Sequence, residues 1–261
     1  GYAAPRVRMA PGQAILGASG RPGRCWWDRL DGGDTMTNYY LSRVDLNARR
    51  QGARKLMLSP QAMHAAVESS LPPSARVPGE RFLWRLDTSG VRNELFVVSP
   101  GEPDFTHIVE QAGWATSDTK GWGSRPYNRL LDRLAEGQLW AFRLAANPVR
   151  MGKAPDGKRQ RFGHVTAVQQ LEWMLERCEP NGFEIPLETG GEPALELIDR
   201  GTLRFRRAPN SPPVTITKAV YEGVLRVKDP QLLRDALVRG IGRARAYGCG
   251  LMTLAPIGTA G

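Results

Sequence analysis

A glycine-rich stretch near the C-terminal end constrains this chain more than any other feature. It runs from Gly240 to Pro256 and reads GIGRARAYGCGLMTLAP. Glycine lets the backbone take a positive φ and lets another backbone approach closely, and a loop with free amides and guanidinium groups suits a phosphate chain. An ordinary turn after a helix is the alternative interpretation. The candidate phosphate contacts are Gly242, Arg243, Arg245, Gly248 and Gly250.

The charge of the chain indicates a polyanionic partner. Its 36 Lys and Arg residues outnumber its 26 Asp and Glu residues, which gives a formal net charge of +10. Such a balance favours nucleic acid over a membrane surface. The sequence has no apolar run of about 18 residues and no secretory signal. The three cysteines, Cys25, Cys178 and Cys249, are odd in number and far apart, which is typical of free thiols in a reducing cytoplasm.

Residues 1–35 differ from the rest of the chain. They are rich in Gly, Pro and Arg and have no periodic apolar pattern. We interpret them as a leader or flexible extension. An ordered extension packed by Trp26 and Trp27 is the alternative, and no function is assigned to this segment.

The order of predicted elements in residues 36–147 indicates a ferredoxin-like domain. Alternating apolar residues predict a first strand over 39–46, and Thr88–Gly90 is typical of a hairpin turn. The segment that leads to Pro126 has no clear assignment. The predicted elements are a strand at 39–46, a helix starting at Ser59–Pro60, strands at 81–87 and 91–99, a helix around 103–113, and a strand at Leu139–Ala146.

His64 is the candidate catalytic residue of this domain. Met63, Ala66 and Val67 form the apolar stripe of the predicted helix, and His64 lies at its edge with Gln61 on the exposed side. An imidazole at the rim of a core can transfer protons in either direction near neutral pH, because its ordinary pKa is about 6.5. A surface histidine without a role is the alternative interpretation.

Two basic segments are candidates for contact with RNA. Asn47–Lys55 is predicted to be a loop, and its cations are either solvated surface or nucleic-acid contacts. Arg150–Val165 is predicted to be a protruding hairpin that turns at Asp156-Gly157. The candidate RNA-binding residues of the two segments are Arg54, Lys55, Arg150, Lys153, Lys158, Arg159 and Arg161.

Residues 148–261 are predicted to form a second domain of the same helix-and-strand order. It contains the basic hairpin, and the glycine-rich loop lies between its last helix and last strand. Predicted strands cover 194–207, 214–227 and 251–257. The predicted inward-facing positions are Val168, Leu171, Leu175 and Cys178 on one helix and Leu232, Leu233, Ala236 and Leu237 on the other.

About residues 39–257 resemble the CasE family, the repeat-processing endoribonucleases of type I-E CRISPR systems. The most specific parts are YLSRVDL with MHAAV, FRLAANP, EWMLER, YEGVLRV and the terminal loop. The resemblance implies an α+β fold of tandem ferredoxin-like (RRM-like, RAMP-type) domains. It also implies cofactor-free and metal-independent cleavage of precursor CRISPR RNA at the base of the repeat hairpin, and binding to crRNA and to other Cascade subunits.

The resemblance assigns the catalytic role to His64 and RNA-stem binding to the ANP-plus-basic segment. Some family members have a tyrosine three residues before the histidine, where this chain has Gln61. An amide cannot transfer a proton as a phenol can, although it can hold the scissile phosphate by hydrogen bonding.

The residue pattern agrees with metal independence. His64, His107 and His164 are widely separated, and the cysteines have no ligand spacing. Cleavage without metal can use the RNA 2′-hydroxyl as nucleophile, which leaves 2′,3′-cyclic phosphate and 5′-hydroxyl ends. Arg54, Lys55 and Arg245 are candidates to offset charge on the phosphorane. The alternative is a non-catalytic RNA-hairpin-binding protein of the same fold, in which His64 is idle.

Overall fold

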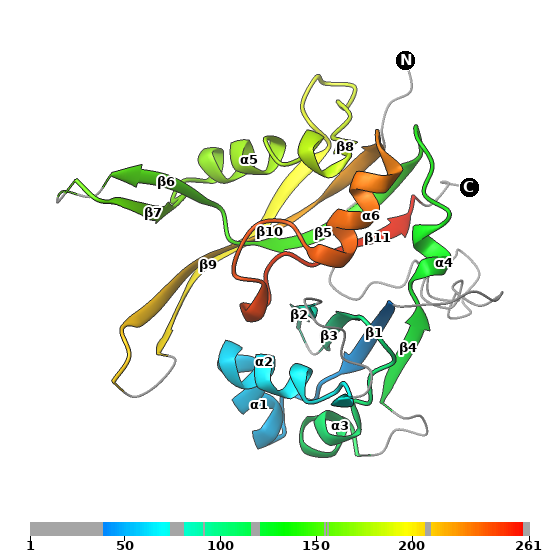
Figure 1. Cartoon of the computed structure of the whole chain (residues 1–261), viewed down its shortest axis with the longest axis vertical. Coiled ribbons are helices and arrows are strands. Elements are labelled where there is room, and N and C mark those ends of the chain that lie inside the picture. Colours follow the sequence, from blue (N-terminus) through cyan, green and yellow to red (C-terminus); the bar gives the residue numbers. More distant parts are fainter. Residues whose placement is uncertain are drawn as a thin grey trace.

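The computed structural model describes residues 39–73, 81–90, 92–115, 121–153, 155, 157–206 and 210–257. The predicted leader lies outside these residues, as do Cys25, Val91 and Asp156. The described chain forms two antiparallel sheets with helices packed on them (Figure 1).

The first sheet has the strand order β2-β3-β1-β4. Its strands are β1 (Tyr40–Asp45), β2 (Leu83–Ser89), β3 (Arg92–Ser99) and β4 (Trp122–Pro126). Helices α1 (Gln51–Leu58) and α2 (Pro60–Glu68) connect β1 to β2, and α3 (Thr106–Ala112) lies between β3 and β4. The chain therefore follows the ferredoxin-like pattern, in which the first strand lies between the third and the fourth.

The second sheet repeats this arrangement. Its order is β11-β5-β10-β8, and β9 also pairs with β10. Its elements are β5 (Leu139–Ala146), α5 (Ala167–Leu175), β8 (Phe183–Glu184), β9 (Leu195–Arg206), β10 (Pro213–Val227), α6 (Pro230–Arg239) and β11 (Met252–Pro256). The hairpin of β6 (Val149–Lys153) and β7 (Arg159–Gly163) forms a separate ribbon, and the short helix α4 (Asn128–Leu131) connects the two sheets. The fold class is therefore tandem ferredoxin-like.

The expectation that Leu139–Ala146 closes the first sheet is wrong. This strand, β5, pairs with β10 and β11 in the second sheet. The fourth position of the first sheet is taken by β4, which pairs with β1 from Trp122↔Val44 to Pro126↔Tyr40. All five residues of β4 are half-buried and include Gly123 and Pro126, so its sequence lacks the alternation of a strand. We propose that the domain boundary lies between β4 and β5 rather than at residue 147.

The prediction of a loop over Asn47–Lys55 is also wrong, because helix α1 begins at Gln51. Ala53 and Leu56 are buried on its inner face. The preceding Arg50 donates hydrogen bonds to the carbonyls of Val109 (3.2 Å) and Gly113 (3.1 Å) at the end of α3. Arg50 therefore ties two helices together.

Helix α5 is rotated from its predicted orientation, and on α6 only one predicted inward position is wrong. On α5, Trp173 and Met174 are 3% and 0% exposed, whereas Val168 is 64% exposed. On α6, Leu232 is 43% exposed, while Leu233 and its helical neighbours are buried. The inward positions predicted for Val168, Leu175 and Leu232 are therefore wrong.

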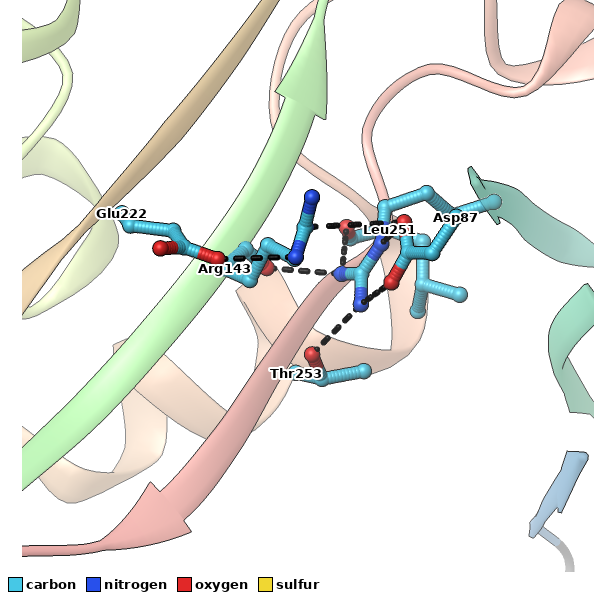
Figure 2. Close-up of polar contacts among 6 residues, drawn as sticks. Asp87, Arg143, Glu222, Leu251 and Thr253 are labelled. Carbon is cyan, nitrogen blue, oxygen red and sulfur yellow. Dashed lines mark hydrogen bonds and ion pairs between the residues drawn. The ribbon is translucent and has the colours of Figure 1, made fainter. Parts of the chain in front are cut away.

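A buried arginine joins the two sheets (Figure 2). Arg85 of β2 is 2% exposed and donates to both carboxylate oxygens of Asp87, each at 2.8 Å. It also donates to the carbonyls of Arg143 (2.7 Å) and Leu251 (3.2 Å) and to the hydroxyl of Thr253 (2.9 Å), all in the second sheet or next to it. These five bonds match the five N–H groups of a guanidinium. The first sheet is thus fixed to β5 and β11.

A carboxylate of β10 extends this network. Glu222 lies 2.8 Å from Nη1 of Arg143, and both side chains are buried. Burial raises the pKa of Glu222 to about 7, against the opposing effect of Arg143. Burial also opposes ionisation of Asp87, but the guanidinium of Arg85 holds the pKa of Asp87 below its ordinary value. The two carboxyl groups of one network thus shift in opposite directions.

Candidate functional site

Helix α2 presents His64 at the edge of a buried face. The helix starts as predicted, because the Ser59 hydroxyl accepts a hydrogen bond from the Ala62 amide at 3.2 Å and Pro60 follows at the first helical position. Met63 and Val67 are 1% and 0% exposed, which fixes the inner face. The His64 side chain is 29% exposed. Its position is therefore determined by core packing on one side and open to solvent on the other.

His64 meets the glycine-rich loop of the second domain. Its ring centroid lies 6.4 Å from that of Tyr247, with a 60° angle between the ring planes. Its Nε2 atom is 3.4 Å from Oε1 of Glu68, one helical turn later. Its Nδ1 atom is buried and has no hydrogen-bond partner among the described residues. The Nε2 edge is therefore the part of the imidazole that solvent and a substrate can reach.

The loop is held in place by its backbone and by contact with the first sheet. Ala244 has a φ of 61° and begins the short 3-10 turn η4 (Arg245–Tyr247). Gly248 follows at a φ of 79°, and a Cβ atom there would lie 2.6 Å from the indole of Trp84 on β2. Both residues lie in the left-handed region, where only glycine is free of strain. The turn therefore projects Tyr247 toward α2 in one orientation.

The structure gives a packing reason for Gly248 and Gly250. Both are buried, and a Cβ at Gly250 would meet the Ile241 carbonyl at 3.1 Å and the Arg245 side chain at 3.2 Å. Packing within the protein is sufficient to require glycine at these two positions, and their contact with RNA stays a prediction. Gly242 is half-buried and lines a cleft.

A cleft of about 600 Å³ lies between this loop and the end of α5. Four arginines line it, Arg81, Arg177, Arg243 and Arg245, and no carboxylate is among its lining residues. Asn147 is 8% exposed, and its Oδ1 atom has no hydrogen-bond partner in the described chain. The Oδ1 atom is an acceptor and calls for a donor group. The four arginines are what give the cleft the character of a site for an anionic ligand.

The concentration of positive charge in the cleft disfavours the charged form of Arg245. Its Nε atom is buried and makes no hydrogen bond with the residues that the structure describes. Burial, together with the nearby charges of Arg81 and Arg243, lowers the pKa of Arg245. A phosphate group would relieve both effects.

The predicted basic hairpin is confirmed as β6–β7, and Figure 1 shows it projecting from the second sheet, away from α1 and α2. All five of its predicted cations, Arg150, Lys153, Lys158, Arg159 and Arg161, are exposed. Lys153 lies directly across from Arg159, and Arg161 shares their face of the ribbon. Like charges in such positions are destabilising. No described carboxylate forms an ion pair with these three residues, so the ribbon is suited to a polyanion.

The remaining predicted residues lie on α1 and α2. Arg54 donates a hydrogen bond to the Arg49 carbonyl at 3.0 Å, so its guanidinium helps to close the turn before α1. Lys55 is exposed on α1. Gln61 is half-buried on α2, one turn before His64. The structure therefore brings Gln61, His64 and the glycine-rich loop together, but not the hairpin cations.

Sequence reasoning missed a row of cations on β9. Arg200, Arg204 and Arg206 are exposed at alternate positions of the ribbon that β9 forms with β10. Phe205 contacts Tyr247 edge-to-face, with ring centroids 4.8 Å apart. The alternation in RGTLRFR was the available signal, because a period of two places the arginines on one face of a strand. Tyr247, Arg81 and Arg177 carried no comparable local signal, whereas Asn147 lies in the ANP segment for which the resemblance implied RNA-stem binding.

Three further observations concern the described part of the chain. No group of three or more His, Cys, Asp or Glu side chains there could hold a metal ion. Cys178 and Cys249 are buried free thiols. No helix among the described residues has the length and apolar character needed to cross a membrane.

Comparison with known proteins gives consistent matches. The family model described as "CRISPR associated protein" matches residues 39–256. The "CRISPR-associated endoribonuclease Cse3" of Thermus thermophilus is 29% identical over 223 residues, which cover 83% of this chain and 100% of that protein. The "CRISPR system Cascade subunit CasE" of Escherichia coli is 29% identical over 187 residues, covering 67% of this chain and 89% of the relative.

A solved structure of Thermus thermophilus Cse3, bound to an RNA representing a pre-cleavage complex, is similar to this chain with a TM-score of 0.70. The two are 28% identical, and the match covers 84% of this chain and 100% of the other.

Proposed function

The chain belongs to the CRISPR associated protein family, and on that premise we propose that it is a metal-independent endoribonuclease acting on precursor CRISPR RNA. It cleaves at the base of the repeat hairpin and remains on the mature crRNA as a subunit of Cascade. The observation that carries the proposal is the position of His64, half-exposed beside the glycine-rich loop. The printed names of the relatives, an endoribonuclease and a Cascade subunit, support it.

The chemistry uses a nucleophile that the substrate contains. His64 accepts the proton of the 2′-hydroxyl at its Nε2 edge, and the 2′-oxygen attacks the adjacent phosphorus. The products are a 2′,3′-cyclic phosphate and a 5′-hydroxyl. Glu68, 3.4 Å from Nε2, can stabilise the imidazolium that forms. Arg245 is the first residue of the turn η4, which also carries Tyr247, and it offers a cation for the phosphorane charge.

The basic surfaces supply the RNA-binding part of the proposal. The β6–β7 ribbon and the β9 row lie on different elements of the second domain, and the arginine-lined cleft adds Arg81 from the segment before β2. Phosphate contacts fix the register of an RNA duplex without reading its sequence. Together these surfaces can hold a hairpin stem while one phosphodiester reaches α2.

The test is cleavage of cognate repeat RNA in EDTA, with analysis of both new ends. We expect 2′,3′-cyclic phosphate and 5′-hydroxyl ends, and we expect His64→Ala to lower the single-turnover rate by about 100-fold with little change in RNA affinity. His107→Gln is a matched control, since it alters another histidine of the first domain and retains a donor for the Ala66 carbonyl, 3.0 Å from His107 Nε2.

A specific observation favours a second candidate, a non-catalytic RNA-hairpin-binding protein. Gln61 lies one turn before His64 and cannot transfer a proton. Tight RNA binding without cleavage in the wild-type protein would establish this alternative and reject the endoribonuclease.

A further inference from the structure

Cleavage by a 2′-hydroxyl requires two proton transfers, and His64 performs one of them. The 2′-oxygen loses a proton, and the departing 5′-oxygen must gain one. We propose that Tyr247 is the general acid that protonates the 5′-oxygen. This inference rests on the proposed function, and it assigns a catalytic role to a residue of the second domain.

The position of Tyr247 supports this role. Its ring lies between two others, with centroids 6.4 Å from His64 and 4.8 Å from Phe205, and its side chain is half-buried. The left-handed residues Ala244 and Gly248 flank its turn. A side chain held in this way can present its hydroxyl in a fixed direction, which proton transfer requires.

The other polar groups around His64 cannot serve as the acid. Gln61 has an amide, which gives up no proton at neutral pH. Glu68 lies 3.4 Å from the Nε2 atom of His64, where its carboxyl group is placed to stabilise the imidazolium rather than to reach the departing oxygen. Arg245 keeps its proton as a guanidinium and stabilises charge instead. A phenol carries a proton at neutral pH and can donate it.

The 2′-hydroxyl proton moves to Nε2 of His64 while the O2′–P bond forms. The P–O5′ bond breaks, and O5′ takes the phenolic proton of Tyr247. The products are the cyclic phosphate and the 5′-hydroxyl, with His64 as imidazolium and Tyr247 as phenolate. Transfer of one proton from His64 to Tyr247 restores both. Attack in line places the two oxygens on opposite sides of phosphorus, so the base and the acid must come from different directions, as α2 and the loop do.

The experiment compares two substrates in single-turnover cleavage. One is the natural repeat RNA, and the other carries a 5′-bridging sulfur at the scissile bond. Sulfur leaves as a thiolate, because a thiol is far more acidic than an alcohol and needs no acid catalyst. We expect Tyr247→Phe to cleave the natural RNA about 100-fold more slowly than wild type, and the sulfur substrate within about 3-fold of wild type.

Two control variants distinguish a failure of the acid role of Tyr247 from a failure of the proposed function. His64→Ala should remain slow on both substrates, because removal of the 2′-proton is still required. Tyr40→Phe removes a phenol from the end of β1 that pairs with Pro126 and should cleave both substrates normally. Normal cleavage of natural RNA by Tyr247→Phe, or an equal loss on both substrates, would overturn the acid role and leave the proposed function intact. Normal cleavage by His64→Ala would instead overturn the proposed function.

A second variant covers the case in which Tyr247→Phe does not fold. A fluorinated tyrosine at position 247 retains the hydroxyl and nearly the same ring size but has a more acidic phenol. We expect the alkaline limb of the pH–rate profile to move to lower pH. An unmoved limb would also overturn the acid role.

Discussion

Arginines occur in two contrasting settings in this molecule. Arg85 is sealed between the sheets, and each of its five N–H groups has an acceptor. The cleft beside the glycine-rich loop gathers Arg81, Arg177, Arg243 and Arg245 without a lining carboxylate. The guanidinium of Arg85 is neutralised and fully hydrogen-bonded within the protein, whereas no carboxylate lines the cleft to neutralise its four arginines. Hydrogen bonding and charge pairing, more than burial, therefore distinguish these two settings.

The largest effect that sharpens this comparison is expected from Asp87→Asn. The substitution leaves Arg85 buried without its counter-ion, which typically costs about 3–5 kcal/mol of the free energy of unfolding. Urea denaturation measures it. Asp45→Asn is the matched control, because its 3.8 Å pair with Arg43 is exposed and should contribute less than about 1 kcal/mol. If Asp87→Asn and Asp45→Asn have equal free energies of unfolding, the buried ion pair contributes no more to stability than the surface pair.

The next largest effect is a pH dependence of stability that comes from Glu222. Burial raises the pKa of this carboxyl group to about 7. The folded protein then holds a proton between about pH 4.5 and 7 that the unfolded chain releases, so this group's contribution to stability falls as pH rises through that range. Between about pH 5 and 8, we expect wild type to lose about 2 kcal/mol relative to Glu222→Gln. Parallel pH profiles of the two proteins in urea denaturation would exclude a raised pKa.

The smallest effect concerns the open cleft. Arg245→Gln should weaken binding of repeat RNA about tenfold and reduce the slope of log affinity against log salt by about one, since one phosphate contact is lost. Its free energy of unfolding should stay equal or rise, because a like-charge cluster is relieved. Arg133→Gln, an exposed arginine after α4, is the control. A variant that binds RNA normally but unfolds more easily would make Arg245 a structural arginine like Arg85.

Local patterns predicted the elements whose signals lie within a few residues. The Ser59 cap and the Pro60 start of α2, the β6–β7 hairpin and the final strand β11 were all predictable. The strand β4 was not, because its partner β1 is distant and its residues do not alternate. The rotation of α5 was missed because Trp173 and Met174 face a core assembled from both sheets.

The candidate site likewise has residues that local patterns could identify and residues that they could not. His64 could be identified from its place at the edge of an apolar stripe and from family resemblance. Its neighbour Tyr247 could not, because their contact depends on how the two domains dock. The same docking bears on Gly248, because the Trp84 indole of the other sheet leaves no room for a Cβ there. Sequence periodicity describes faces of single elements, and this site is built where elements of two domains meet.

The contact between α2 and the glycine-rich loop joins residues that are synthesised far apart in time. The site can therefore form only after the C-terminal part of the chain has been made. His64 emerges from the ribosome early, with the first sheet, whereas Tyr247 follows only after β10 and α6. Domains generally fold in the order of translation. A nascent chain can therefore complete its first sheet and expose the imidazole while the loop is still unmade. A polypeptide that stops before Gly240 therefore contains His64 but lacks Tyr247 and the glycine-rich loop.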